Sequence, residues 1–181
     1  MRVVGIQDWA DVAWRDAFAD GQFVGPRLFC CGQVLRPTAG HSATLGRVPA
    51  ATAVSLDGVD AVVRAVRTNI KHGVDQIKLA TTGGIMGTGD DVMPVAMFLR
   101  EEVEAAVRIS NQRGLLVAAH ATSPEPVRWA AHAGSNSIEH GYILDEETAR
   151  LMSQRGVYYV PTLALSHLTV DQASTPYETS Y

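Results

Sequence analysis

The sequence has little cysteine, no long hydrophobic run and no cluster of basic residues. Its two cysteines, Cys30 and Cys31, are adjacent, and disulfide geometry disfavours pairing between chain neighbours. We interpret them as buried strand residues rather than redox groups. The longest apolar stretches have the length of β-strands, so we expect no transmembrane helix. A net charge of −4 without a Lys/Arg cluster argues against nucleic acid or an anionic membrane as a partner.

The start of the chain also lacks the apolar segment of a signal peptide. We therefore expect a cytoplasmic protein, although a missing signal means nothing if the chain begins inside a longer one. The composition itself is that of an ordinary globular protein, with 181 residues of which 46% are hydrophobic. Because this length can bury one sizeable core and no linker is present, we predict a single domain, or a piece of one, over residues 1–181.

Short apolar runs alternate with longer segments of helical period. The runs lie near residues 3–6, 27–32, 75–80, 115–119, 136–138 and 157–161. Helices are predicted over 57–71 with Asp57 as the cap, over 100–113, after Ser123, and over 146–154 with Asp145 as the cap. Strands that alternate with helices form a parallel sheet, so the pattern predicts an α/β fold.

Three potential metal ligands stand at or near the ends of apolar runs, namely Lys78, His120 and His140. The carboxyl ends of parallel strands meet at one face of a (β/α) barrel, which is where such barrels carry metal sites. Either histidine alone could equally be a core-edge residue that is satisfied by a backbone carbonyl. Lys78 is more informative, because a lysine inside an apolar strand is costly unless it snorkels, pairs or is neutralised. A neutral lysine can react with carbon dioxide, and the resulting carbamate can bridge two cations.

A series of motifs extends over nearly the whole chain in a fixed order. They are Gly25-Pro26-Arg27, Thr38-Ala39-Gly40-His41, Ile77-Lys78-Leu79-Ala80-Thr81-Thr82-Gly83-Gly84, Gly89-Asp90-Asp91, Val117-Ala118-Ala119-His120-Ala121, Ser137-Ile138-Glu139-His140-Gly141 and Val160-Pro161-Thr162-Leu163. In order and spacing they resemble the amidohydrolase superfamily, most closely its imidazolonepropionase-like and prolidase-like branch.

The resemblance implies a metal-dependent hydrolase on a distorted (β/α)8 barrel of the TIM type, in which a carboxylated lysine bridges two divalent ions. Carried over, Lys78 is the bridging ligand, while His120 and His140 hold the second, more exposed metal. Zinc is the expected ion, although manganese, cobalt or iron would suit the same ligands. Two cations lower the pKa of a bridging water toward roughly 7. The implied reaction is hydrolysis of a C–N bond in a small-molecule amide, a cyclic amide or a dipeptide.

Five residues are expected to face the substrate, namely His41, Gly83, Gly84, Thr122 and His167. Gly83 and Gly84 belong to a glycine-rich loop over residues 81–91 beside the metal. Thr122 stands two residues after His120, where the family often has a histidine or an aromatic residue. For His41, a loop histidine without a role is an open alternative.

Two features of the family have no counterpart in the sequence. No His-X-His pair occurs, and Asp171, after the last apolar run, lacks the strand context of the family's catalytic aspartate. Because a full barrel takes about 250 residues, we interpret the chain as an internal fragment that covers roughly strands 2 to 7. We expect the isolated chain to be inactive, and its exposed edge strands to favour a homo-oligomer.

The sequence alone leaves two alternatives to a hydrolase open. One is a non-catalytic remnant that folds but hydrolyses nothing. The other is a phosphate-binding barrel that uses loop 81–91, although this loop lacks the Gly-Lys-Ser/Thr ending of a phosphate-binding loop. Metal retention that depends on His120 and His140 would separate a hydrolase from a phosphate binder.

Overall fold

The computed structural model describes residues 1–6, 8–41, 44–45, 48–49, 53–85 and 92–164. Its centre is a six-stranded sheet in the order β4-β1-β5-β6-β7-β8, with every neighbouring pair parallel. The strands are β1 (Val34–Arg36), β4 (Ala53–Ser55), β5 (Gln76–Ala80), β6 (Leu116–Ala121), β7 (Ser137–His140) and β8 (Tyr158–Val160). A separate antiparallel pair joins β2 (Thr44–Leu45) to β3 (Val48–Pro49). The predicted α/β fold is confirmed.

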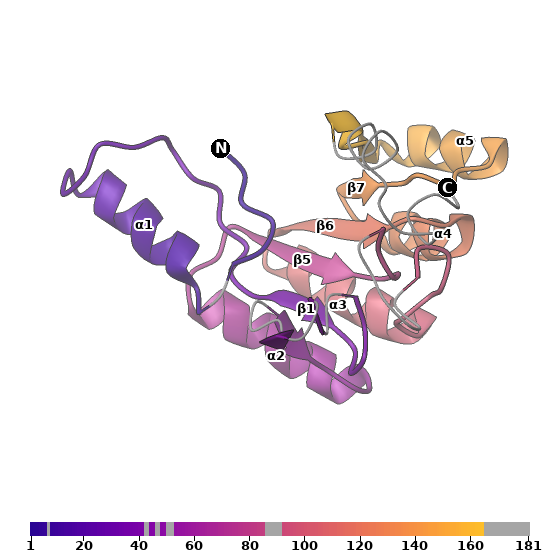
Figure 1. The fold of residues 1–181 in the computed structure, drawn as a ribbon, viewed down its shortest axis with the longest axis horizontal. Coiled ribbons are helices and arrows are strands. Elements are labelled where there is room, and N and C mark those ends of the chain that lie inside the picture. The colour runs from indigo at the N-terminus through magenta and orange to yellow at the C-terminus, as the bar shows by residue number, and fades with distance from the viewer. Residues whose placement is uncertain (7, 42–43, 46–47, 50–52, 86–91, 165–181) are drawn as a thin grey trace.

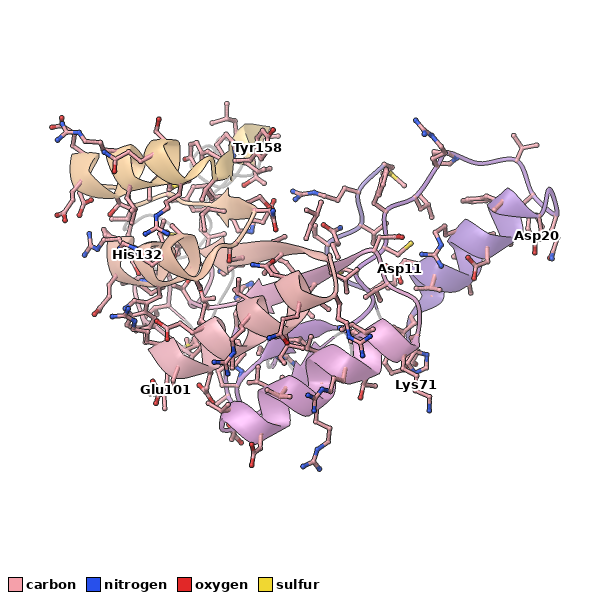
Figure 2. All side chains as sticks on the ribbon, turned by 180° about the vertical axis from the view of Figure 1, so that it is seen from behind. Asp11, Asp20, Lys71, Glu101, His132 and Tyr158 are labelled. Carbon is pink, nitrogen blue, oxygen red and sulfur yellow. The ribbon has the colours of Figure 1, made fainter. Side chains whose placement is uncertain are left out.

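Helices cover one face of the sheet. They are α2 (Val59–Lys71), α3 (Arg100–Gln112), α4 (Pro124–Ala133) and α5 (Glu146–Arg155), each packed against the next (Figure 2). The first helix, α1 (Ala10–Ala19), lies apart from these four, at the end of the molecule opposite α5 (Figure 1). No helix in the described residues is long and apolar enough to cross a membrane.

The core lies between the sheet and these helices. In α2, apolar side chains recur at three- and four-residue spacing, so Val62 and Val66 share one buried face. The sheet side of the core comes from alternate strand residues, because successive side chains of a strand point to opposite faces. Its members include Leu35, Ile77, Leu79, Val117, Ala119 and Ile138. The other face of the sheet is therefore free to carry polar groups.

The four predicted helices are found with ends that differ by at most one or two residues, and the predicted cap of α2 is wrong. Pro124 is the first residue of α4, and the Asp145 carboxylate accepts a 2.7 Å hydrogen bond from the Thr148 N–H at the start of α5. In α2, the cap position belongs to Gly58 rather than to Asp57. The reason is that the Asp57 carboxylate is used elsewhere, accepting hydrogen bonds from the amide and hydroxyl of Thr38 at 3.1 and 2.7 Å.

The first two predicted strands are extended segments outside the main sheet. Residues 1–6 run beside residues 27–32, joined by the parallel bridge between Arg2 and Phe29. The amide of Ile6 donates to the carbonyl of Gly32 at 3.1 Å. The sheet instead contains β1 and β4, which the periodicity did not predict. Because β4 lies outside β1, the strands at this edge depart from the chain order of a regular barrel.

Cys30 and Cys31 are buried, as predicted, and free, but neither lies in a strand, because β1 begins only at Val34. Burial raises the pKa of both thiols to about 12, so neither is a reactive thiolate at neutral pH. The Asp11 carboxylate accepts hydrogen bonds from the amides of Cys31 and Gly32 at 2.9 and 3.0 Å, which ties α1 to this segment.

Candidate metal centre

The predicted ligands meet on the face of the sheet that the helices leave uncovered. On β5, Ile77 and Leu79 enter the core, so Lys78 points to the opposite face. The parallel register sets Ala80 beside His120, and His120 beside Glu139. Together with residues at the strand ends, these side chains surround a cavity of about 230 Å³. Its lining consists of Val4, Val34, Arg36, His41, Lys78, Ala80, His120, Glu139, His140 and Thr162.

His140 reaches the cavity only because its backbone leaves the strand conformation. Glu139 and His140 are consecutive yet line the same cavity, which a regular strand forbids. At His140 the φ angle is +73°, in the left-handed region that a residue with a Cβ enters at a cost of about 1–2 kcal/mol. The imidazole then lies edge-on to that of His120, with ring centroids 4.6 Å apart. Strain of this kind at a strand end is typical of functional residues.

The hydrogen-bond partners of the two histidines indicate which ring nitrogen each leaves for a metal. Nε2 of His120 lies 2.8 Å from the carbonyl oxygen of Gly83, and since a carbonyl only accepts, Nε2 carries the hydrogen. The lone pair of His120 is therefore on Nδ1. In His140, Nδ1 pairs with the hydroxyl of Thr162 at 2.9 Å, which leaves Nε2 as the nitrogen for coordination.

Burial shifts all three candidate ligands toward their uncharged forms. It lowers the pKa of Lys78 to about 8, although the nearby Glu139 carboxylate acts in the opposite direction. It also lowers the pKa of His140 to about 4, with a further contribution from the charge of Lys78, and holds the pKa of His120 well below its ordinary value. Both imidazoles are thus neutral at pH 7, the form that binds metals.

Lys78 lacks the carboxylate partner that its position suggests. Its Nζ is buried and has no hydrogen-bond partner in the part of the chain that the structure describes. Glu139 is held by Arg2, whose Nη2 donates to both carboxylate oxygens at 2.8 and 2.7 Å, and by the Ser137 hydroxyl at 2.6 Å. Among the described residues, the buried amine of Lys78 therefore has no hydrogen-bond acceptor, although Glu139 lies close enough to act on its charge.

These residues fit a divalent metal in one specific way. Among the described residues, no group of three or more His, Cys, Asp or Glu side chains could hold a metal ion. Two imidazoles alone make an incomplete set, but a carbamate on Lys78 would add oxygen ligands and give a nitrogen and oxygen donor set that suits zinc. The unpartnered Nζ beside two neutral imidazoles is the observation that supports this fit.

The predicted substrate residues fall into different places. His41 lines the cavity, and its ring stacks on His120 with centroids 4.3 Å apart. Gly84 packs against His41 so closely that a Cβ there would lie 2.0 Å from the imidazole Cε1. Thr122 is fully buried, outside the residues that line the cavity, and contacts the Thr82 hydroxyl at 2.9 Å. His167 lies outside the described residues.

Arg36 is a cavity residue that sequence reasoning missed. It is 3% exposed, and its Nη1 donates to the backbone carbonyl of His41 at 2.8 Å. The available signal was the same as for Lys78, a cation at the end of an apolar run, but Val34-Leu35-Arg36 is too short to show a period. Thr162, which orients His140, was also missed as a site residue, although it stands in one of the recognised motifs.

The comparisons with known proteins converge on one group of enzymes. The Amidohydrolase family matches residues 1–176. The ochratoxinase of Aspergillus niger is 34% identical over 165 residues, which cover 81% of this chain and 34% of that protein. The fold is similar to that of an Xaa-Pro dipeptidase with bound methionine in the active site, with a TM-score of 0.86 and 31% identity. That match covers 99% of this chain and 48% of the dipeptidase.

A second solved structure has a similar fold. A prolidase complexed with N-methylphosphonate-L-proline has a TM-score of 0.83 and 31% identity over 99% of this chain and 47% of its own. The chain thus spans about a third of the ochratoxinase and about half of the two solved structures.

Proposed function

Because this chain belongs to the amidohydrolase family, we propose that it provides part of the metal site of an enzyme that hydrolyses C–N bonds. The family predicted from the sequence motifs is confirmed. The convergence of Lys78, His120 and His140 on one cavity carries the proposal. The substrate class follows from the similar proteins, an Xaa-Pro dipeptidase and a prolidase, and is an amide-linked compound such as a dipeptide.

In this proposal Lys78, as a carbamate, and the free ring nitrogens of His120 and His140 hold divalent metal, with zinc expected and two ions in the whole enzyme. When bound, the metal supplies Lewis acidity and lowers the pKa of water. The protein's own contribution is orientation. Gly83 and Thr162 hold the two imidazoles through their second nitrogens, and Arg2 keeps the Glu139 carboxylate in place.

The remaining cavity residues favour a substrate with a negatively charged end. Arg36 brings a permanently charged guanidinium to the cavity, and such a group pairs well with a carboxylate. His41 stacks on His120 and faces the same space, so it is a second candidate for substrate contact.

The alternative of a phosphate-binding loop has less support. Such a site needs backbone N–H groups that point at the ligand. In the first part of the glycine-rich loop, Gly83 is buried and its N–H donates to the carbonyl of Val95 at 3.1 Å. Residues 86–91 of this loop lie outside the described residues. A non-catalytic remnant stays a second candidate, because the sequence contains no His-X-His pair.

The test is a chimera in which this chain replaces the matching segment of the Xaa-Pro dipeptidase that it resembles. Loaded with zinc, the chimera is expected to hydrolyse dipeptides, and the same chimera with Lys78→Ala is expected to lose that activity. The 181-residue chain alone is expected to show none. A folded, zinc-loaded chimera without turnover would contradict the hydrolase proposal and favour the remnant.

A further inference from the structure

The described residues between β5 and α3, 81–85 and 92–99, fold back over the end of β5. Thr82 and Ala96 form an antiparallel bridge, and the Met97 amide donates to the carbonyl of Thr81 at 2.9 Å. This return brings the Gly83 carbonyl oxygen within 2.8 Å of Nε2 of His120. Residue 83 must be glycine because its backbone lies close to Val92. A Cβ at this position would lie 2.2 Å from the Val92 carbonyl oxygen.

Two buried hydroxyls connect this segment to the residue that follows β6. Thr82 and Thr122 are both fully buried, and their hydroxyl oxygens are 2.9 Å apart. The Thr122 hydroxyl donates to the carbonyl of Met93, while the Thr122 amide donates to the Thr82 hydroxyl at 3.1 Å. Next to this pair, the Ser123 hydroxyl donates to the carbonyl of Pro94 at 2.9 Å. The loop is thus attached to the end of β6 and not only to its own strand.

The Thr82 hydroxyl also acts on the carbonyl that His120 uses. Its oxygen lies 3.0 Å from the carbonyl oxygen of Gly83, toward which it can donate. That carbonyl has two lone pairs, so it can accept from Thr82 and from Nε2 of His120 together. The Thr82 oxygen accepts from the Thr122 amide, and its single hydrogen has two acceptors in reach, the Gly83 carbonyl at 3.0 Å and the Thr122 hydroxyl oxygen at 2.9 Å. Thr82 therefore links the loop to Thr122 directly beside the carbonyl that His120 uses.

We propose that Thr82 and Thr122 are positioning residues which fix the Gly83 carbonyl, so that His120 keeps its hydrogen on Nε2 and presents Nδ1 to a metal. This inference rests on the proposed metal site and adds the groups that select the tautomer of its buried histidine. A neutral imidazole without such a partner distributes its hydrogen between two nitrogens, and only one tautomer points its lone pair correctly. Thr122 accordingly acts through His120 rather than through the substrate.

The test reads the tautomer directly, without metal or substrate. Long-range proton–nitrogen NMR of the 15N-histidine-labelled, metal-free chain identifies which nitrogen of His120 is protonated, and His120→Gln assigns the signals. We expect the Nε2–H tautomer in the unmodified chain and in Thr82→Ser, and a mixture in Thr82→Val. The matched control is Thr148→Val, which removes another fully buried hydroxyl on α5, far along the chain from the loop.

Zinc affinity, measured by competition with a chelator, gives the second readout. Substitutions of groups that orient a metal ligand typically weaken binding about 10–100-fold, and we expect such a loss for Thr82→Val but not for Thr82→Ser or Thr148→Val. A His120 with its hydrogen on Nδ1 in the unmodified chain would overturn the proposal, even if Thr82→Val does not fold. A folded Thr82→Val with unchanged tautomer and zinc affinity would do the same. Loss of turnover in the dipeptidase chimera would contradict the hydrolase function but leave the tautomer result standing.

Discussion

At the scale of single residues, the sequence locates the site through misfits between a side chain and its surroundings. Lys78 lies in a strand whose residues are all buried, and the structure leaves its amine without a hydrogen-bond partner in the described residues. Such a misfit can be recognised without coordinates. The direction of His140 cannot, because it depends on a φ angle of +73° that no apolar period reveals.

Burial of Lys78 makes the stability of the chain depend on pH. Its pKa falls from 10.5 to about 8 in the folded state, so between these values the unfolded chain binds more protons. The contribution of Lys78 to stability therefore rises as the pH is raised through this window, by at most about 3 kcal/mol, while the two buried thiols act in the opposite direction above pH 9. Urea unfolding at pH 8 and pH 10, in buffers free of carbon dioxide, measures the effect. Lys78→Met is expected to lose this contribution, whereas Lys71→Met, at an exposed lysine, is expected to retain it. The same change in unfolding free energy between pH 8 and pH 10 in the unmodified chain and both variants would contradict the assignment.

The left-handed backbone at residue 140 gives a second prediction. His140→Ala and His140→Gly both remove the imidazole and its bond to Thr162. Only the glycine variant removes the strain, so we expect it to be more stable than the alanine variant by about 1 kcal/mol. Chemical denaturation of the two variants measures the difference. An alanine variant of equal or greater stability would mean that the backbone is not strained there.

At the scale of elements, helices were easier to predict than strands. The helices carry three- to four-residue periods and glycines just past their ends, whereas β1 and β4 have three residues each and no period to read. The runs near residues 3–6 and 27–32 are extended, as their composition suggests, but pair with each other outside the main sheet. Strand composition fixes the local conformation, while the choice of partner depends on contacts far away in the chain.

One long-range contact of this kind joins the N-terminal segment to β7. Arg2 forms an ion pair with Glu139, whose side chain is 4% exposed while that of Arg2 is 35% exposed. Arg2→Met would leave a buried carboxylate without its cation, and we expect a loss of about 2 kcal/mol, less than for a fully buried pair. In a background of Glu139→Gln the same change should cost much less. Urea denaturation of the unmodified chain, the two single variants and the double variant gives the coupling free energy between Arg2 and Glu139. If the losses of the two single variants add up to that of the double variant, the ion pair contributes nothing.

At the scale of the whole molecule, the open sheet determines the behaviour of the chain. Edge strand β8, where Figure 2 labels Tyr158, pairs only with β7 among the described residues. Its Tyr158 and Tyr159 are 76% and 48% exposed. Unpaired edges of this kind favour association with another chain. The last apolar run in the sequence, near residues 157–161, contains this edge strand, while the exposed fractions of its tyrosines could be learned only from the structure.

We therefore expect the 181-residue chain to self-associate, as the sequence analysis predicted for a homo-oligomer. Tyr158→Lys places a charge on the exposed edge and is expected to weaken the association roughly tenfold or more. Phe23→Lys, at a residue that is 57% exposed near the far end of α1, is the matched control and should have little effect. Sedimentation equilibrium over a range of concentrations measures both. A monomer at every concentration would contradict this prediction.

The central claim is that His120 and His140 hold a divalent metal together with Lys78. The most direct measurement is the zinc content of the purified chain, by elemental analysis after loading and removal of excess zinc. The unmodified chain and His132→Ala, which changes an exposed histidine on α4, should retain zinc in a stoichiometric amount. The double variant His120→Ala with His140→Ala should retain none. An unchanged zinc content in the folded double variant would contradict the account.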